Sequence, residues 1–299
     1  MTRTHPFASR RYAEALAGPE AAVPVPEWGS HMIRRPIGPE GLADVVGTYP
    51  LQVFARGDDI EAGLERLARQ GLVSAVLVPD PLLCPAPGLA RAFEVCRPFK
   101  THYLIDPARG PFAPSKHHAD RIRRGVRRCE VRRGPLAAWL GDWRELYAGL
   151  VARRGITGAA AFSPAYFQML AEEPFITAFA AFVGEACAGM TLWFAADGVI
   201  YNHLTAANTV GYANGANFAL YDAAIAHFAG QGVVNLGGGA GFSDRDDGLA
   251  AFKRGFANGE VAAHLCGAVL DPAAYATLGG GRQANDFFPA YRAPALAAA

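Results

Sequence analysis

Cysteine is scarce in this sequence and forms no motif. Five cysteines are spread along 299 residues, with no CxxC pair and no cysteine–histidine spacing of the kind that holds zinc. An odd number without a pattern is typical of proteins in a reducing compartment. The His, Asp and Glu residues show no metal-ligand spacing either, so we predict small buried thiols and no metal site.

Long apolar runs are also missing. Residues 1–18 contain no apolar core like that of a signal peptide. The longest apolar stretch, residues 175–196, is broken by Gly184, Glu185 and Gly189, whereas a bilayer span needs about 18 apolar residues in a row. The formal net charge of +1 gives no overall attraction to nucleic acid or membrane. We therefore expect a cytoplasmic protein without membrane insertion.

The composition is that of a well-packed globular protein. Hydrophobic residues make up 51% of the chain and charged residues 18%, which excludes an intrinsically disordered protein. A chain of 299 residues is long for one core but suits two domains, each of about 150 residues.

The first third of the chain predicts an α/β layer. Residues 12–18 indicate a short helix, and residues 59–71 an amphipathic helix with an apolar stripe that begins at Ile60. Residues 24–38 hold too many prolines and glycines for regular structure. Apolar or alternating runs predict strands over residues 51–57, 72–80 and 99–106.

The remainder predicts helices around an antiparallel sheet. Ser163 and Pro164 mark the start of a helix over residues 163–173. Asp197–Gly198 is a strong hairpin signal. Further helices are expected over residues 136–155 and 215–232, and a short helix or turn over residues 247–256. Strands are expected over residues 175–184, 185–197, 198–208, 233–239 and 260–271.

Residues 114–133 are strongly basic. They contain eight of the 28 Lys and Arg residues but only two of the 27 acidic residues. One interpretation is a solvated helix between two domains, and the other is a phosphate-binding surface for a large anion. The second makes Lys116, His117, Arg123 and Arg124 candidate ligands. No aromatic residues alternate with the arginines, so base stacking is not supported there.

Residues 235–256 carry the most specific pattern in the chain. Gly237, Gly238 and Gly239 follow a short apolar strand, and Lys253 stands just after Phe252. Glycines let a ligand approach the backbone, whose N–H groups can donate to it. The alternatives are a flexible glycine loop and a lysine on an exposed turn. Two acids, Asp246 and Asp247, are expected to cap the following helix.

This segment, in its order of elements, resembles the FemABX-like branch of the GNAT acyltransferase superfamily. The match runs over about residues 114–271 and rests on the Gly-Gly turn, the acidic residues and the Phe-Lys-x-Gly-Phe segment at residues 252–256. A likeness to bacterial acetyltransferase 6 proteins is also present. The resemblance implies two tandem GNAT-like domains of α/β (α+β) class, with mixed, mostly antiparallel sheets flanked by helices. Residues 1–135 would form a degenerate domain ending in a basic linker helix, and residues 136–299 the catalytic domain.

The resemblance also implies an activity. Proteins of this branch join an activated acyl or aminoacyl group to an amine, so we expect amide formation with aminoacyl-tRNA or acyl-CoA as co-substrate and no permanently bound cofactor. The acceptor would be a small-molecule or peptide amine, and tRNA a partner. Residues 209–220 lack the glycine spacing of the CoA pyrophosphate turn, which favours aminoacyl-tRNA. The small size of the chain favours acyl-CoA.

Particular residues are assigned to this chemistry. Lys253 would stabilise the oxyanion, because apolar neighbours strengthen its field. Tyr201 and His203, expected on one strand face with Thr205, would relay the proton that leaves the amine. In the family the residue matching Phe252 meets the 3′ end of the aminoacyl-tRNA. The other candidate donor-binding residues are Gly237, Gly238, Gly239, Asn214 and Gly215.

Two other classes of function stay open at this point. A non-catalytic small-molecule-binding or scaffold protein could share the fold, although a scaffold has no need of the Phe-Lys-x-Gly-Phe segment. A nucleic-acid-binding protein could use residues 116–133. The near-zero net charge and the absence of interleaved aromatics argue against nucleic-acid binding as the sole function.

Overall fold

The structure is a computed structural model that describes residues 4–39, 41–56, 59–84, 86–110, 113–240, 247–279 and 287–293. The chain forms two compact units. The first contains residues 1–99 and 263–299, and the second contains residues 100–262. Each unit is a sheet covered by helices, as expected for the α/β (α+β) class.

The first unit is built on the strand order β1-β2-β3-β4-β11. Only β3 and β4 run parallel, and the other neighbours in this order are antiparallel. Trp28 lies at the centre of the core, and its Nε1 donates to the carbonyl oxygen of Ile60, 3.1 Å away. The elements of this unit are α1 (Arg10–Ala17), β1 (Ala22–Val25), β2 (Ser30–Ile37), β3 (Leu42–Gly47), α2 (Ile60–Arg69), β4 (Ser74–Leu77), α3 (Ala86–Ala92), β11 (Gly259–Val269, through its C-terminal part) and α10 (Pro272–Gly279).

Two expectations for the first unit are wrong. Residues 24–38 form parts of β1 and β2 despite their prolines. Pro24 lies on an edge strand, and Pro36 lies beyond the end of β1, so a missing N–H costs the sheet little at either position. Of the strand expected over residues 51–57, the described residues 51–56 form only a single bridge, at Gln52. The buried Gln52 side chain instead accepts the N–H of Thr48 and donates to Ser30 Oγ.

The second unit has the strand order β5-β10-β9-β8-β7-β6. Three successive antiparallel strands form its centre, as expected from the sequence: β7 (Thr177–Val183), β8 (Ala186–Ala196) and β9 (Val199–Ala207). The short β10 (Val233–Asn235) runs parallel to β9 and antiparallel to β5 (Val95–Ile105). At the other edge, β6 (Glu130–Gly134) pairs with β7.

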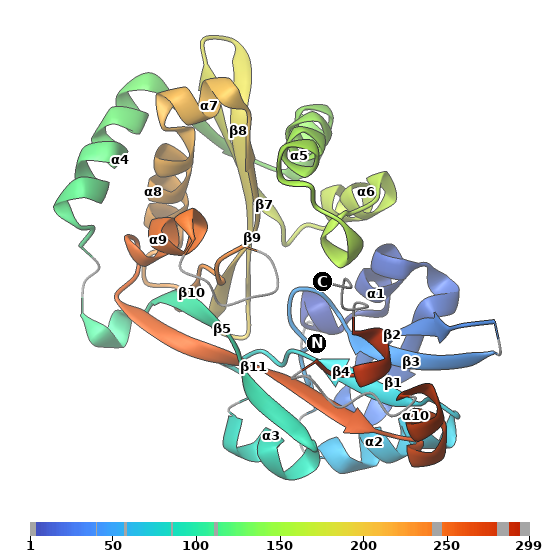
Figure 1. Ribbon diagram of the computed structural model, residues 1–299. Coiled ribbons are helices and arrows are strands. Elements are labelled where there is room, and N and C mark those ends of the chain that lie inside the picture. The colour runs from blue at the N-terminus through green and yellow to red at the C-terminus, as the bar shows by residue number, and fades with distance from the viewer. Residues whose placement is uncertain are drawn as a thin grey trace, which may run out of the picture. The chain divides into compact units, whose positions relative to one another are not determined.

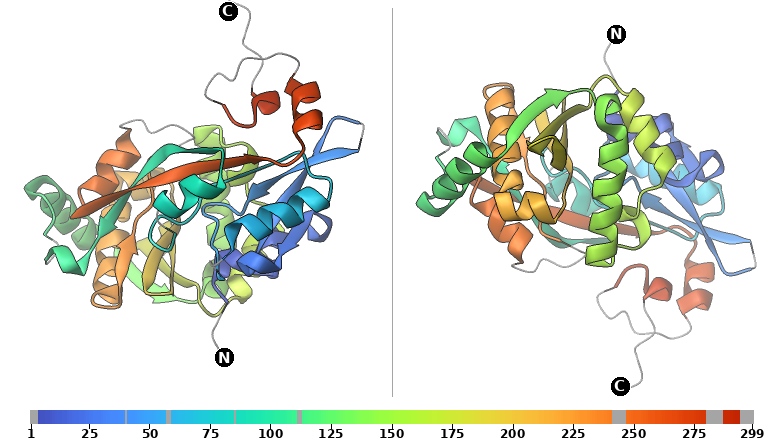
Figure 2. Two further views of the ribbon diagram at one scale, coloured as in Figure 1. Left: turned by 90° about the horizontal axis from the view of Figure 1, so that it is seen from below. Right: turned by 90° about the horizontal axis from the view of Figure 1, so that it is seen from above.

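Helices cover both faces of this sheet (Figure 1). α8 (Ala216–Phe228) packs on β7 and β8, with α4 (Lys116–Arg128) outside it. α5 (Leu140–Arg154) and α6 (Pro164–Glu172) lie on the opposite face, side by side in the view from above (Figure 2). Local signals set these helices: Ser163 Oγ accepts the N–H of Tyr166, and α5 ends at a left-handed Gly155. Two short helices complete the unit, α7 (Thr209–Asn214) and α9 (Gly248–Arg254).

The basic helix α4 belongs to the second unit, which differs from the expected division between residues 135 and 136. A Cβ on Gly125 of α4 would lie 2.5 Å from the carbonyl oxygen of Gly215, so only glycine allows the two backbones to approach here. Strand pairing adds a second difference, because Cys266–Val269 of β11 pairs with β4 and joins residues 263–299 to the first unit. Neither contact has a local signal in the sequence.

Within the part of the chain that the structure describes, no helix is both long and apolar enough to cross a bilayer.

Candidate active site

The three glycines lie in a tight turn at the end of β10. A Cβ on Gly237, which has φ of +74°, would lie 3.2 Å from Lys253 Nζ. A Cβ on Gly238 would lie 2.9 Å from the carbonyl oxygen of Thr101. A Cβ on Gly239 would lie 3.2 Å from Asp247 Oδ2. The turn therefore consists of glycines because polar groups of the protein itself converge on its backbone.

Lys253 is held inside this turn. Its side chain is only 8% exposed, and Nζ donates to the carbonyl oxygen of Gly238 at 2.8 Å. The pKa of Lys253 is lowered to about 7, mainly by burial and in part by the positive charge of Lys100, while Asp247 acts in the opposite direction. Near neutral pH the amine can thus carry a proton or accept one, and both states are useful in acid–base chemistry. The alternative of a lysine on an exposed turn is excluded.

Lys100 is a second lysine at the same turn. Its Nζ donates to the carbonyl oxygen of Gly239 at 2.9 Å, one residue beyond the carbonyl bound by Lys253. Our sequence analysis missed Lys100, although a signal was present. The chain has only three lysines among its 28 basic residues, and two of them meet at this turn. Lysine differs from arginine in that its pKa shifts readily when it is buried.

Asn235 and His102 complete the polar surroundings of the turn. Asn235 is 2% exposed, and its Oδ1 accepts the N–H of Gly237 at 2.8 Å. The Nδ1 atom of His102 lies 3.2 Å from the same oxygen. The sequence analysis missed both residues, because nothing local shows that the strand holding His102 pairs with a strand some 130 residues later.

Asp247 caps α9 and ties it to the turn, as expected. Oδ1 accepts the N–H groups of Leu249 and Ala250, and Oδ2 accepts that of Ala240. These donors lower the pKa of Asp247, although burial acts in the opposite direction. The same expectation for Asp246 falls outside the described residues.

Phe252 lies in an aromatic cluster between α9 and α8. Its ring centroid is 5.0 Å from that of Phe218 and 4.8 Å from that of Tyr221. The carbonyl oxygen of Phe252 lies 3.0 Å from Nε2 of His118, a residue of α4. This packing fixes the position of Lys253, the next residue, whereas the donor-binding role of Phe252 stays a prediction.

Tyr201 lies beside the turn, because it is the β9 partner of Asn235 in the parallel ladder. It is buried and stacks on Phe194, with ring centroids 4.9 Å apart. The ladder between β9 and β10 ends at this pair, while β9 continues to Ala207. The proton relay proposed for Tyr201 stays a prediction.

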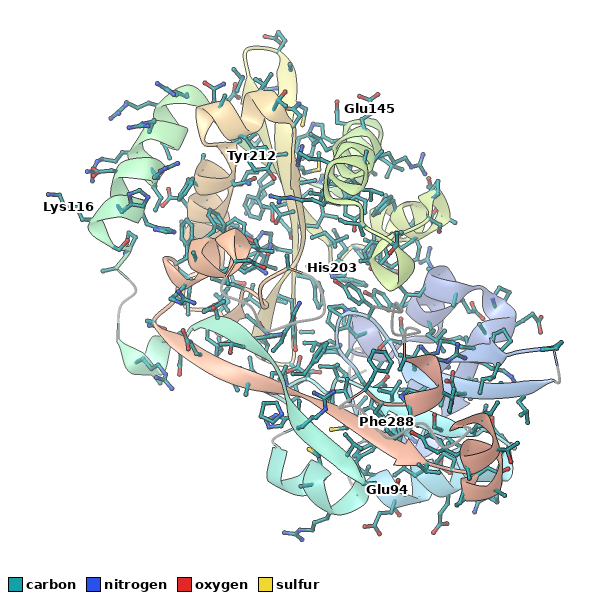
Figure 3. The ribbon with its side chains drawn as sticks, in the orientation of Figure 1. Glu94, Lys116, Glu145, His203, Tyr212 and Phe288 are labelled. Atoms are coloured by element: carbon teal, nitrogen blue, oxygen red, sulfur yellow. The ribbon has the colours of Figure 1, made fainter. Side chains whose placement is uncertain are left out.

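His203 lies two residues further along β9, next to α6. Its Nε2 is 2.7 Å from the hydroxyl oxygen of Tyr166. Burial lowers the pKa of His203 to about 3, so the imidazole is neutral at physiological pH. Figure 3 shows His203 on the sheet face that α5 and α6 cover. Its role in proton relay also stays a prediction.

The expectation that Thr205 shares a face with His203 is wrong. Trp193 of β8 pairs with Asn202 and Leu192 pairs with Leu204, which leaves His203 as an extra residue in the ladder. A bulge of this kind reverses the alternation of side chains beyond it. Thr205 therefore lies with Asn202, whose Nδ2 is 3.3 Å from Thr205 Oγ1.

The basic candidates lie on α4, in the outer helical layer. Lys116, His117, Arg123 and Arg124 are exposed, and Arg123 pairs with Asp120. Figure 3 shows Lys116 at the start of α4, pointing away from the sheet, on the opposite side of the sheet from His203.

The remaining donor-binding candidates, Asn214 and Gly215, lie at the junction of α7 and α8. Gly215 faces Gly125 of α4, and the carbonyl oxygen of Asn214 lies 3.8 Å from Cys129 Sγ. Both therefore pack against α4, while Gly237 and Gly238 lie against Lys253.

An open pocket of about 470 Å³ lies near the opposite, N-terminal end of β10. Its walls are mainly apolar and include Ile105, Phe228 and Val234, with Asp222 at an exposed position. We place the candidate site at the glycine turn rather than in this pocket, because the convergent polar groups and the shifted lysine pKa are at the turn. Over the described residues, no three His, Cys, Asp or Glu side chains gather as a metal site requires.

Comparison with known proteins gives a likeness in structure but none in sequence. No protein-family model matches the chain, and no curated protein matches it. FemX superposes with a TM-score of 0.59 at 12% identity, over 83% of this chain and 86% of FemX. The C-terminal domain of a putative lysylphosphatidylglycerol synthetase from Agrobacterium fabrum gives 0.58 at 13% identity, over 82% of this chain and 81% of that domain. L-PGS from Bacillus licheniformis gives 0.56 at 12% identity, over 83% of each chain.

These likenesses define the fold. The chain has a FemABX-like fold of GNAT type, which confirms the resemblance drawn from residues 235–256 and the expected fold class.

Proposed function

We propose that this protein is an acyl or aminoacyl transferase that forms an amide bond. The observation that carries the proposal is the buried Lys253 amine, held 2.8 Å from the carbonyl oxygen of Gly238 in a turn that Lys100, Asn235 and Asp247 also bind. It supports the proposal because acyl transfer needs a positive charge or a hydrogen-bond donor where the oxyanion develops, in surroundings of low dielectric.

The proposed reaction proceeds through a tetrahedral intermediate. The neutral acceptor amine attacks the acyl carbonyl carbon, and the protonated Lys253 stabilises the oxygen that becomes negative. The C–O or C–S bond to the leaving group then breaks, and the amide C–N bond remains. The proton lost by the amine is relayed by Tyr201 or His203 and ends on the leaving group. Tyr201 is the better placed of the two, since it is the ladder partner of Asn235.

Aminoacyl-tRNA is the donor that we favour. The junction of α7 and α8 packs against α4 at Gly125, in the place where a CoA pyrophosphate turn would need free backbone N–H groups. The exposed arginines of α4 supply a surface for a polyanion. The name lysylphosphatidylglycerol synthetase denotes a protein that forms an aminoacyl product, which supports the same class of donor.

The test is a transfer assay with K253A. Transfer of a labelled acyl group from acetyl-CoA or from alanyl-tRNA to a panel of amines is measured for wild type and variant. We expect K253A to lose at least about 100-fold in rate, with an unchanged circular dichroism spectrum. L249A is the matched control, because Leu249 is an exposed residue on the same helix. Full activity of K253A would refute the proposal. A rise in melting temperature with only one donor identifies that donor.

A further inference from the structure

The side-chain nitrogen of a buried amide at the glycine turn has no hydrogen-bond partner among the described residues. Asn235 is 2% exposed, and among the described residues its Nδ2 atom has no hydrogen-bond acceptor. The orientation of this amide is determined, because the N–H of Gly237 must face an acceptor, and Oδ1 lies 2.8 Å from it. Nδ2 is therefore the donor that is left without an acceptor. A buried N–H donor without an acceptor is costly, so a native protein rarely keeps one without a use.

The side chains of Asn235 and Lys253 both lie against Gly237. Oδ1 of Asn235 binds the nitrogen of Gly237, while Lys253 Nζ would lie 3.2 Å from a Cβ on the same glycine. The two side chains thus lie against one residue from different directions. Asn235 is also the last β10 residue in the ladder, so beyond it β9 and β10 no longer satisfy each other's backbone groups.

We propose that Nδ2 of Asn235 donates a hydrogen bond to an oxygen atom of the bound substrate, of the carbonyl or carboxylate class, and so orients the acyl group toward Lys253. The inference rests on the proposed transferase function and adds a binding residue to its site. His102 acts as a positioning residue for this amide, because its Nδ1 lies 3.2 Å from Asn235 Oδ1 and helps to hold that oxygen away from the substrate.

The first test measures the amide itself and requires no transfer activity. Protein labelled with ¹⁵N-asparagine is titrated with acetamide, acetyl-CoA and an amide-linked analogue of alanyl-adenosine. The Asn235 signal is assigned by its absence from N235D. We expect a saturable shift of this signal with at least one probe. No shift with any of the three probes would overturn the inference, even for a protein that transfers acyl groups. If acetamide shifts the signal but the protein transfers from neither acetyl-CoA nor alanyl-tRNA, the proposed function is refuted and the inference about Asn235 is not.

The second test separates substrate binding from folding. N235D keeps an oxygen that can accept from Gly237 and His102 but lacks the donor, so it loses no internal hydrogen bond. We expect KM for the donor to rise about tenfold, while the unfolding midpoint falls by less than that of the control variant described next. N258D is the matched control, because the Nδ2 atom of Asn258 donates to the carbonyl oxygens of Asp106 and Gly110.

The control should behave in the opposite way. N258D should lower the unfolding midpoint by at least about 4 °C and leave KM unchanged. An unchanged KM in a folded N235D would contradict the inference. An equal rise of KM in N235D and N258D would also contradict it.

Discussion

Nε2 of His118, on α4, lies 3.0 Å from the carbonyl oxygen of Phe252, on α9. The imidazole also lies against Gly255, at a place where a Cβ would overlap the ring. The basic helix and the helix that carries Lys253 are therefore joined through one histidine and one glycine. This contact is the physical link between the two segments that the sequence analysis singled out.

The first prediction concerns the fit of this histidine. G255A should destabilise the protein by about 1–3 kcal/mol, because the added methyl group must displace the His118 ring. H118A should relieve that overlap, so the double variant should be less destabilised than the sum of the two single variants. Urea unfolding of the four proteins measures the coupling. G248A, on the same helix with no atom near its Cβ position, should be neutral. Additive effects of the two variants would argue against the contact.

The second prediction concerns pH and His203. The pKa of His203 is about 3 when folded, below the usual histidine value of 6.5, so the unfolded chain binds the proton more tightly. The stability from its neutral imidazole is complete above pH 6.5 and is lost as the pH falls toward 3. Between pH 6.5 and pH 5 the loss should be about 2 kcal/mol. Urea unfolding of wild type and H203Q at both pH values tests this. The variant should lose less stability, and equal losses would show that His203 does not titrate as described.

The third prediction concerns the cost of burying Lys253. Its pKa is lowered from 10.5 to about 7. Below pH 7 the amine is charged in both states and the folded protein bears the full desolvation cost, which disappears as the pH rises from 7 to 10.5. K253M should therefore be more stable than wild type at pH 6, by about 1–3 kcal/mol, with a smaller difference at pH 10. Denaturant unfolding at both pH values measures it. A less stable K253M at pH 6 would mean that the ammonium is well solvated.

The fourth prediction concerns the second lysine. The positive charge of Lys100 helps to lower the pKa of Lys253, so K100Q should raise that pKa. Lysine labelled with ¹³C at Cε gives only three signals in this chain, and their titration can be followed one by one by NMR. K116Q is the control, because Lys116 is exposed on α4, and it should leave the pKa of Lys253 unchanged. An unchanged pKa of Lys253 in K100Q would show that the charge of Lys100 does not act on Lys253.

Much of the second unit could be predicted because its signals are local. The Asp197–Gly198 turn joins β8 and β9, and the capping Ser163 begins α6, in agreement with the sequence. The errors in the first unit have non-local causes. Residues 24–38 form strands because β1 is an edge strand that tolerates proline, and residues 51–56 follow the hydrogen bonds of a buried Gln52 side chain. Composition and periodicity show neither the edge position of β1 nor the hydrogen bonds of the Gln52 side chain.

The sequence by itself determined the fold family and the segment that contains Lys253, because glycine spacing, capping and periodicity act over a few residues. Only the tertiary structure decided what surrounds that amine. Lys100, His102 and Asn235 reach the turn through the pairing of β5 with β10, and one bulge in β9 moved Thr205 to the other face. Strand pairing and register depend on contacts between residues far apart in the chain, and these contacts exist only once the chain has folded.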